Sequence, residues 1–153
     1  MQQGSQKRVR VLVVEDYEPF RRFVSSVIQL EGDLQVDREV ADGMLAVEGA
    51  IELRPDLILL DIGLPLLSGI EAARRIVQHS PESKILFLTQ ESSPDLVREA
   101  FRLGAWGYVL KSDASAELLS AIRSVLRGTK FVSRSFFRQI DLSLSDPLQE
   151  GGI

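Results

Sequence analysis

Short apolar runs alternate with longer stretches of mixed polarity along most of the chain. The runs are rich in aliphatic residues and end at polar or turn-forming positions, so we expect strands over 9–14, 34–40, 57–60, 84–89 and 107–111. The stretches between them repeat apolar residues at helical spacing, and we expect helices over about 19–31, 44–53, 69–78, 94–103 and 115–127. The apolar residues available for burial on the second helix are Leu45, Val47, Ala50 and Ile51. Strands that alternate with helices indicate a parallel sheet covered on both faces.

The third run, Leu57–Leu60, is aliphatic throughout and ends at Asp61. A continuous apolar run of this length is typical of a strand buried on both faces. The pattern as a whole predicts an α/β fold, a flavodoxin-like doubly wound (βα)5 three-layer sandwich with strand order 2-1-3-4-5. In that order the first and third strands are neighbours, so Glu15 and Asp16 are expected beside Asp61.

Three carboxylates at one sheet edge repel one another unless a cation neutralises them. Mg²⁺ prefers oxygen ligands of this kind and keeps positions for phosphate oxygens. A carboxylate such as Asp61 can act as a nucleophile and form an acyl phosphate. Thr89 and Lys111 end the fourth and fifth strands, where a hydroxyl and an ammonium would stabilise a phosphoryl group.

Each of these residues also has an ordinary structural interpretation when it is taken alone. The acidic pair could cap the following helix, Thr89 could satisfy the backbone at its strand end, and Lys111 could be a solvated surface lysine. Asp61 is harder to explain in this way, because a carboxylate next to four buried aliphatic residues loses solvation. The combination at four strand ends is therefore the specific signal.

Composition narrows the function classes further. The 153 residues include no cysteine and a single histidine, His79, which excludes disulfides and multi-histidine metal sites. The net charge of −4 and the lack of a basic recognition helix argue against direct nucleic-acid binding. The first ten residues are polar and basic, and no apolar run reaches membrane-spanning length. We therefore expect a cytoplasmic protein with no membrane partner.

The residues that end the strands resemble the receiver domain of bacterial two-component response regulators over about residues 8–128. The segments that carry the resemblance are Val11–Asp16, Asp61–Pro65 with Gly69, Leu88-Thr89, Gly104-Ala105 and Tyr108–Lys111. Segments 64–73 and 111–114 are similar to the subfamily usually linked to a LuxR-type helix-turn-helix output domain.

The resemblance implies a role for each matching residue. Asp61 corresponds to the phosphoacceptor, and the Mg²⁺ ligands correspond to Asp16, Asp61, the backbone carbonyl of Gly63 and, through water, Glu15. Thr89 and Lys111 correspond to the residues that stabilise the phosphoryl group. Thr89 and Tyr108 correspond to the switch, in which the tyrosine ring turns inward on activation.

The family's activity and partners follow from the same resemblance. Family members accept a phosphoryl group from a sensor histidine kinase and catalyse only their own phosphorylation and dephosphorylation. Homodimerisation on phosphorylation and control of transcription are further family properties. Gln90 replaces the small residue that is usual after the threonine. Its position and those of Gly63 and Glu91 tune dephosphorylation in the family, so the lifetime of the phosphorylated form stays open.

Residues 1–7 are expected to be a disordered lead-in and residues 129–153 a short helix and linker. No helix-turn-helix follows, so the chain is either a module cut from a longer transcription factor or a stand-alone receiver. Phe136 and Phe137 could pack on this domain or contact an output domain or second subunit.

Three other functions compete with the receiver interpretation. Phosphatases of the haloacid dehalogenase class carry a D-x-D motif after the strand, but in this chain Gly63 stands at the position of the second aspartate. A flavodoxin-like cofactor binder needs a phosphate-binding loop where Glu15 and Asp16 would repel phosphate. A degenerate receiver that acts as a phosphate-independent interaction module would lack some of the five site residues that are present here.

Overall fold

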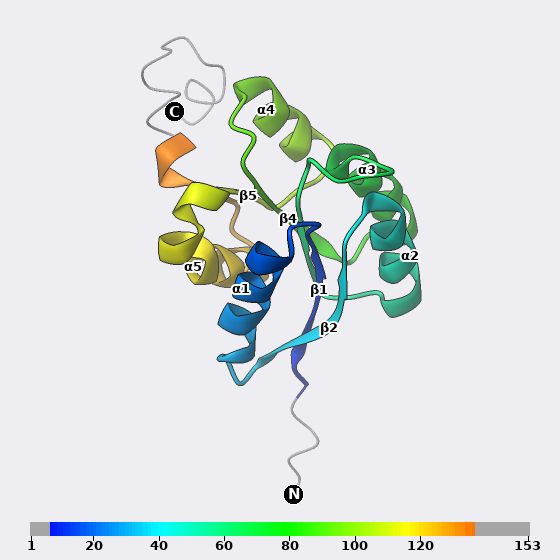
Figure 1. The fold of residues 1–153 in the computed structure, drawn as a ribbon, viewed down its shortest axis with the longest axis vertical. Helices are drawn as coiled ribbons and strands as arrows, with labels where there is room; N and C mark the ends of the chain where they lie inside the picture. The colour runs from blue at the N-terminus through cyan, green and yellow to red at the C-terminus, as the bar shows by residue number, and fades with distance from the viewer. Residues whose placement is uncertain (1–6, 137–153) are drawn as a thin grey trace, which may run out of the picture.

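A six-stranded parallel sheet forms the centre of the computed structural model, which describes residues 7–136 (Figure 1). The strand order is β2-β1-β3-β4-β5-β6, which confirms the predicted order of the first five strands. The elements in chain order are β1 (Val9–Val14), α1 (Glu18–Gln29), β2 (Leu34–Val40), α2 (Gly43–Leu53), β3 (Leu57–Leu60), α3 (Gly69–His79), β4 (Lys84–Thr89), α4 (Pro94–Arg102), β5 (Gly107–Leu110), the 3₁₀ turn η2 (Lys111–Asp113), α5 (Ala114–Leu126) and β6 (Phe131–Val132).

Two apolar cores lie on opposite faces of the sheet. Alternate residues of each central strand belong to different cores: Ile58 and Leu60 pack with α2, α3 and α4, whereas Leu57 and Leu59 pack with α1 and α5. Figure 1 shows the same division, with α1 and α5 on one side of the sheet and the other three helices across it. Because both faces are covered, the strands are apolar throughout, which is the pattern that predicted a parallel sheet.

Helix α2 corrects one expectation. Of the residues predicted to be available for burial, Ala50 is buried, but Leu45 and Ile51 are 42% and 43% exposed. Ala46 and Gly49, which were not predicted, are buried instead. A Cβ added at Gly49 would lie 3.4 Å from the Leu12 side chain. The backbone of α2 therefore lies close to the sheet, and small residues fill the contact.

Strand β6 was not expected. Phe131–Val132 pairs in parallel with β5, and the N–H of Phe131 donates to the carbonyl of Trp106 over 3.1 Å. Phe136 is fully buried against the core, so this ring packs on its own domain. Phe137, the rest of the expected tail helix and linker, and residues 1–6 lie outside the described residues.

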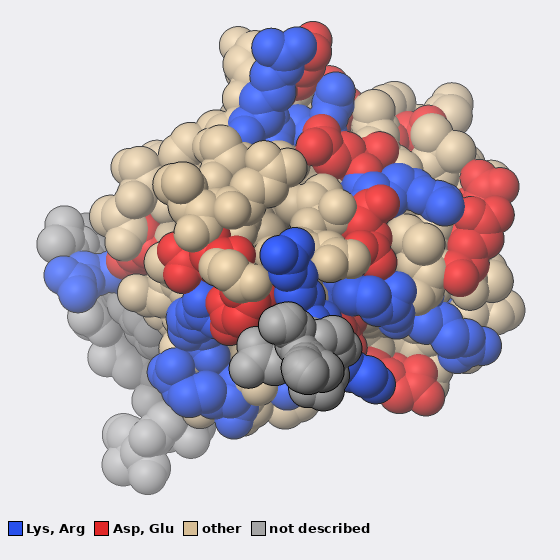
Figure 2. Space-filling model, turned by 90° about the horizontal axis from the view of Figure 1, so that it is seen from below, with Lys and Arg blue, Asp and Glu red and all other residues tan. Residues whose placement is uncertain are grey.

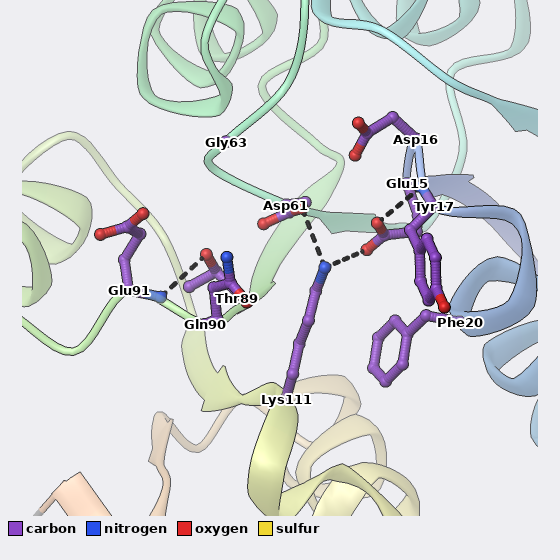
Figure 3. Close-up of a pocket in the computed structure, with 10 residues that line it drawn as sticks. All are labelled: Glu15, Asp16, Tyr17, Phe20, Asp61, Gly63, Thr89, Gln90, Glu91 and Lys111. Carbon is purple, nitrogen blue, oxygen red and sulfur yellow. Dashed lines mark hydrogen bonds and ion pairs between the residues drawn. The ribbon is translucent and has the colours of Figure 1, made fainter.

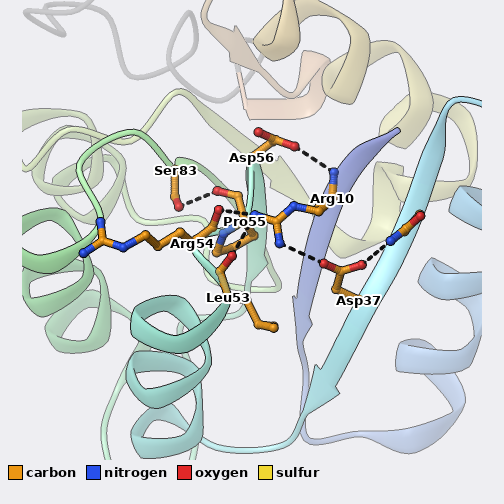
Figure 4. Close-up of polar contacts among 8 residues, drawn as sticks. Arg10, Asp37, Leu53, Arg54, Pro55, Asp56 and Ser83 are labelled. Atoms are coloured by element: carbon orange, nitrogen blue, oxygen red, sulfur yellow. Dashed lines mark hydrogen bonds and ion pairs between the residues drawn. The ribbon is translucent and has the colours of Figure 1, made fainter. Parts of the chain in front are cut away.

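The amino-terminal edge of the sheet is held together by a network around Arg10 (Figure 4). Its guanidinium lies 3.1 Å from Asp37 on β2 and donates to the carbonyls of Leu53 and Arg54 at 2.7 and 2.6 Å. Asp56 accepts from the backbone N–H of Arg10 at 2.9 Å and donates its own N–H to the Arg10 carbonyl. One side chain thus joins β1, β2 and the carboxyl end of α2, where the helix dipole favours a cation.

On the face seen from the amino-terminal side, the Lys and Arg side chains of the described residues are interspersed with Asp and Glu (Figure 2). Within residues 7–136, no helix has the length and apolarity needed to cross a membrane.

Candidate functional site

A pocket of about 490 Å³ opens at the carboxyl ends of the strands, opposite the Arg10 network (Figure 3). Its lining residues are Glu15, Asp16, Tyr17, Phe20, Asp61, Gly63, Thr89, Gln90, Glu91 and Lys111. The structure thus brings together all the predicted site residues except Tyr108, which lies beneath the loop that follows β4. This is the place at which open α/β sheets bind ligands.

Three carboxylates meet at the centre of the pocket. Glu15 and Asp61 follow β1 and β3 directly, and these strands pair in register at Val14 and Leu60. One carboxylate oxygen from each of Glu15, Asp16 and Asp61 lies within 4.8 Å of the others. Glu15 and Asp61 are 3% and 5% exposed, whereas Asp16 is open to solvent. An all-oxygen set with an exposed side fits a hard divalent cation that keeps some of its water ligands.

Backbone groups fix the orientation of Asp61. Its Oδ1 accepts the N–H of Ile62 at 2.7 Å, which leaves Oδ2 toward Lys111. Helix α3 begins very close by, since a Cβ added at Gly69 would lie 1.9 Å from the Asp61 carbonyl oxygen. Ser68 caps α3 by accepting the N–H of Glu71 at 3.2 Å. Gly69 is therefore needed for the helix to approach the backbone of Asp61 and Ile62.

Lys111 neutralises part of this negative charge. Its Nζ lies 2.8 Å from Glu15 Oε1 and 3.1 Å from Asp61 Oδ2, with the ring centroid of Phe20 at 5.0 Å. Burial lowers the pKa of Lys111, but the two carboxylates outweigh burial and raise that pKa overall, so the ammonium stays charged. Burial raises the pKa of Glu15 despite opposing hydrogen bonds from Lys111 and the Tyr17 N–H. One ammonium against three carboxylates leaves the pocket net negative.

Thr89 and Tyr108 meet through Glu91. The buried Thr89 Oγ1 accepts the N–H of Glu91 at 3.3 Å, and the Tyr108 hydroxyl donates to the Glu91 carbonyl at 2.7 Å. The Tyr108 ring is fully buried, which is the inward orientation, with Phe87 and Phe136 at centroid distances of 6.1 and 6.2 Å. Burial, and then the negative charges of Glu91 and Asp61, raise the pKa of Tyr108, so the hydroxyl stays a donor.

The rim of the pocket leaves space over the carboxylates. Gln90 and Glu91 are exposed, and Figure 3 places Glu91 on the opposite side of Asp61 from Asp16. A Cβ at Gly63 would meet no atom within 4 Å. Phe20 is absent from the predicted site residues, yet it lines the pocket as well as packing against the core under α1. Its position in the first turn after the acidic pair is the signal that could have identified it.

Comparison with known proteins assigns the family. The model of the response regulator receiver domain matches residues 11–123. The transcriptional regulatory protein YxjL of Bacillus subtilis is 38% identical over 121 residues, which is 79% of this chain and 56% of that protein. LiaR of the same organism is 35% identical over 78% of this chain and 57% of its own length. The chain therefore matches little more than half the length of these regulators.

Solved structures agree with this assignment. A LuxR-family response regulator from Aurantimonas superposes with a TM-score of 0.83 and 32% identity, covering 90% of this chain and 98% of that one. The receiver domain of NarL from Mycobacterium tuberculosis gives a TM-score of 0.75 and 30% identity over 80% of this chain and 98% of its own. The chain belongs to the receiver domains of two-component response regulators, and its relatives include regulators of the LuxR family.

Proposed function

We propose that this domain accepts a phosphoryl group on Asp61 from a sensor histidine kinase. The observation that carries the proposal is the position of Asp61, a nearly buried carboxylate that lines an open pocket beside two further carboxylates and an ammonium. A backbone N–H fixes one of its oxygens, so the side chain is already oriented. Preorganisation of this kind lowers the barrier to in-line attack.

The transfer itself needs only positioning and charge. A carboxylate oxygen of Asp61 forms a bond to phosphorus while the bond from phosphorus to the donor's imidazole nitrogen breaks, and the electron pair leaves with the imidazole. Mg²⁺ held by Asp16, Asp61, the Gly63 carbonyl and, through water, Glu15 would neutralise the phosphoryl oxygens. Lys111 exchanges a carboxylate partner for a phosphoryl oxygen, and Thr89 donates its hydroxyl to another. Gly63 and Glu91 at the rim set how readily water reaches the acyl phosphate.

Phosphorylation adds a concentrated negative charge beneath the loop that carries Glu91. Thr89 responds by donating its hydroxyl to the phosphoryl group. Tyr108 responds because its hydroxyl is bonded to Glu91 in the same loop, which holds the ring in its buried position. The output is transcriptional control, since YxjL and LiaR are named transcriptional regulatory proteins. It would be exerted through an output domain or through a homodimer that forms on phosphorylation. No nucleic acid contact is assigned to residues 7–136.

Intact mass after incubation with acetyl phosphate and Mg²⁺ tests the phosphoacceptor. We expect one added phosphoryl group that is removed by hydroxylamine, that fails to form with EDTA and that is absent in Asp61→Asn. Asp56→Asn, which removes an aspartate at the other edge of the sheet, is the matched control and should be phosphorylated normally. A wild-type chain that acquires no phosphoryl group and binds no beryllofluoride would instead be a phosphate-independent interaction module.

A further inference from the structure

Four residues after β6, Ser133–Phe136, lie against the strand and turn that carry Tyr108 and Lys111. In Figure 1 they form the start of the orange turn beside α5. Each of the four makes a contact with the region between Tyr108 and Glu117, whether through a backbone hydrogen bond, a side-chain hydrogen bond or a ring contact. The segment is thus attached to the part of the molecule that would respond to the phosphoryl site.

Ser133 ties this segment to the end of β5. Its N–H donates to the Tyr108 carbonyl at 3.0 Å, and its Oγ accepts the N–H of Leu110 at 2.8 Å. The residue is fully buried, so both hydrogen bonds are shielded from water. Ser135 adds a bond from its hydroxyl to Asp113 at 2.8 Å, and the N–H of Arg134 lies 3.3 Å from a carboxylate oxygen of Glu117.

Phe136 completes the packing around the Tyr108 ring. Both rings are fully buried, and their centroids are 6.2 Å apart at an interplanar angle of 46°. Tyr108 is thereby enclosed by Phe87 on β4 and by Phe136. If Tyr108 left this position, the Phe136 ring would lose part of its apolar contact, and the reverse is equally true.

A chain of hydrogen bonds connects this packing to the pocket. Thr89 Oγ1 accepts from Glu91 at 3.3 Å, which leaves the Thr89 proton free to donate toward Asp61's side of the pocket. Donation to a phosphoryl oxygen would polarise the hydroxyl and make its oxygen a better acceptor, because linked hydrogen bonds strengthen one another. The bond to Glu91 would shorten, and the Glu91 carbonyl would be held more firmly on the Tyr108 hydroxyl.

We infer that the segment Ser133–Phe136 is docked on Tyr108 as a built-in sensor of the Asp61 pocket, and that phosphorylation tightens this docking. The surface formed by Tyr108, Leu110 and Asp113 is thus occupied by the chain's own segment Ser133–Phe136, whose attachment depends on the state of the pocket. This inference rests on the proposed function and adds its route of regulation.

Hydrogen exchange on the full chain, with and without Mg²⁺ and beryllofluoride, tests the inference. The amides to follow are those of Ser133, Leu110 and Phe136, which bond to Tyr108, Ser133 Oγ and the Ser133 carbonyl. We expect beryllofluoride to slow their exchange about five-fold or more, the usual scale of coupling between two sites. Tyr108→Ala should abolish this change.

A reciprocal measurement uses variants that keep an apolar side chain but remove the aromatic ring. Phe136→Leu removes the ring contact and should weaken beryllofluoride binding by about five-fold, since coupling is equal in both directions. Phe131→Leu is the matched control, because Phe131 lies on β6, just before the segment, and packs in the core on the other face of the sheet. It should bind beryllofluoride as the wild type does.

The outcomes separate the inference from the function beneath it. If beryllofluoride binds and protects Glu91 but leaves the Ser133 and Phe136 amides unchanged, the docked segment is not a sensor and the phosphoacceptor proposal stands. Beryllofluoride binding that is weakened equally in Phe131→Leu and Phe136→Leu would also overturn the inference. If beryllofluoride does not bind the wild type, both proposals fall together.

Discussion

The two edges of the sheet both concentrate charged residues, but they balance charge in different ways. At the amino-terminal edge, Arg10 has a carboxylate and two helix carbonyls as fixed partners, and Asp56 is bonded to backbone (Figure 4). At the carboxyl edge, three carboxylates lie together and Lys111 pairs with two of them, Glu15 and Asp61 (Figure 3). A network whose groups are paired by the chain itself stabilises the fold. A cluster with excess charge is stabilised only when a ligand supplies the rest, and it therefore marks the functional edge.

The largest expected effect would come from breaking the geometry of the carboxyl edge. Gly69→Ala places a methyl group 1.9 Å from the Asp61 carbonyl oxygen, so α3 or the Asp61 loop must move. We expect a loss of about 3 kcal/mol in the free energy of unfolding, measured by urea denaturation. Gly63→Ala is the control, because its Cβ would contact nothing within 4 Å. Equal stability of the two variants would contradict the assigned packing.

The amino-terminal edge should respond in stability alone. Arg10→Met keeps the aliphatic stem but removes the ion pair and both bonds to the end of α2, for an expected loss of about 2 kcal/mol. Arg38→Met, which breaks a more exposed pair with Glu52, should cost far less. Phosphorylation by acetyl phosphate should be unchanged in folded Arg10→Met. If folded Arg10→Met lost phosphorylation, the amino-terminal edge would contribute to function as well as to stability, which would contradict the distinction between the two edges.

Removal of the Lys111 ammonium should sharpen the contrast between the two edges. Lys111→Met leaves Glu15 and Asp61 without their ion pair, so Mg²⁺ should bind more tightly, by roughly five-fold for one unit charge at this range. Calorimetric titration with Mg²⁺ measures the change. Lys130→Met removes an equal charge outside the pocket and should leave the affinity as it is. Unchanged affinity in Lys111→Met would mean that the lysine does not compete with a cation.

The smallest effect concerns an exposed ion pair that belongs to neither edge cluster. A hydrogen bond from Arg123 holds the pKa of Asp33 below its usual range. Because the folded pKa is lowered, the stabilisation is present above the ordinary pKa of about 4 and is lost as the pH falls through the lowered value. Asp33→Asn should therefore decrease Tm slightly at pH 7 and leave it unchanged near pH 2. A larger difference at low pH would reverse the assigned sign.

The sequence was sufficient for the strand order and for the convergence of the site. Each site residue stands where a buried apolar run ends, and parallel strands align their carboxyl ends, so Glu15, Asp61, Thr89 and Lys111 had to meet. The residue roles themselves remain predictions.

Other features depended on distances that a periodic pattern does not contain. Helical spacing shows which residues share a face, but not that α2 contacts the sheet through Ala46, Gly49 and Ala50 while Leu45 and Ile51 stay exposed. Strand β6 has two residues, too few to show a period. The contact between Phe136 and Tyr108 joins residues from separate elements, so no local pattern could predict it.

The most direct test of the account measures thermal unfolding with and without Mg²⁺ and beryllofluoride in three chains. A ligand that binds only the folded state raises Tm. The account predicts equal increases in Tm for the wild type and for Asp37→Asn, which weakens only the amino-terminal network, and no increase for Asp61→Asn. An increase in Asp61→Asn equal to that of the wild type, or its loss in Asp37→Asn, would contradict the assignment of function to the carboxyl edge.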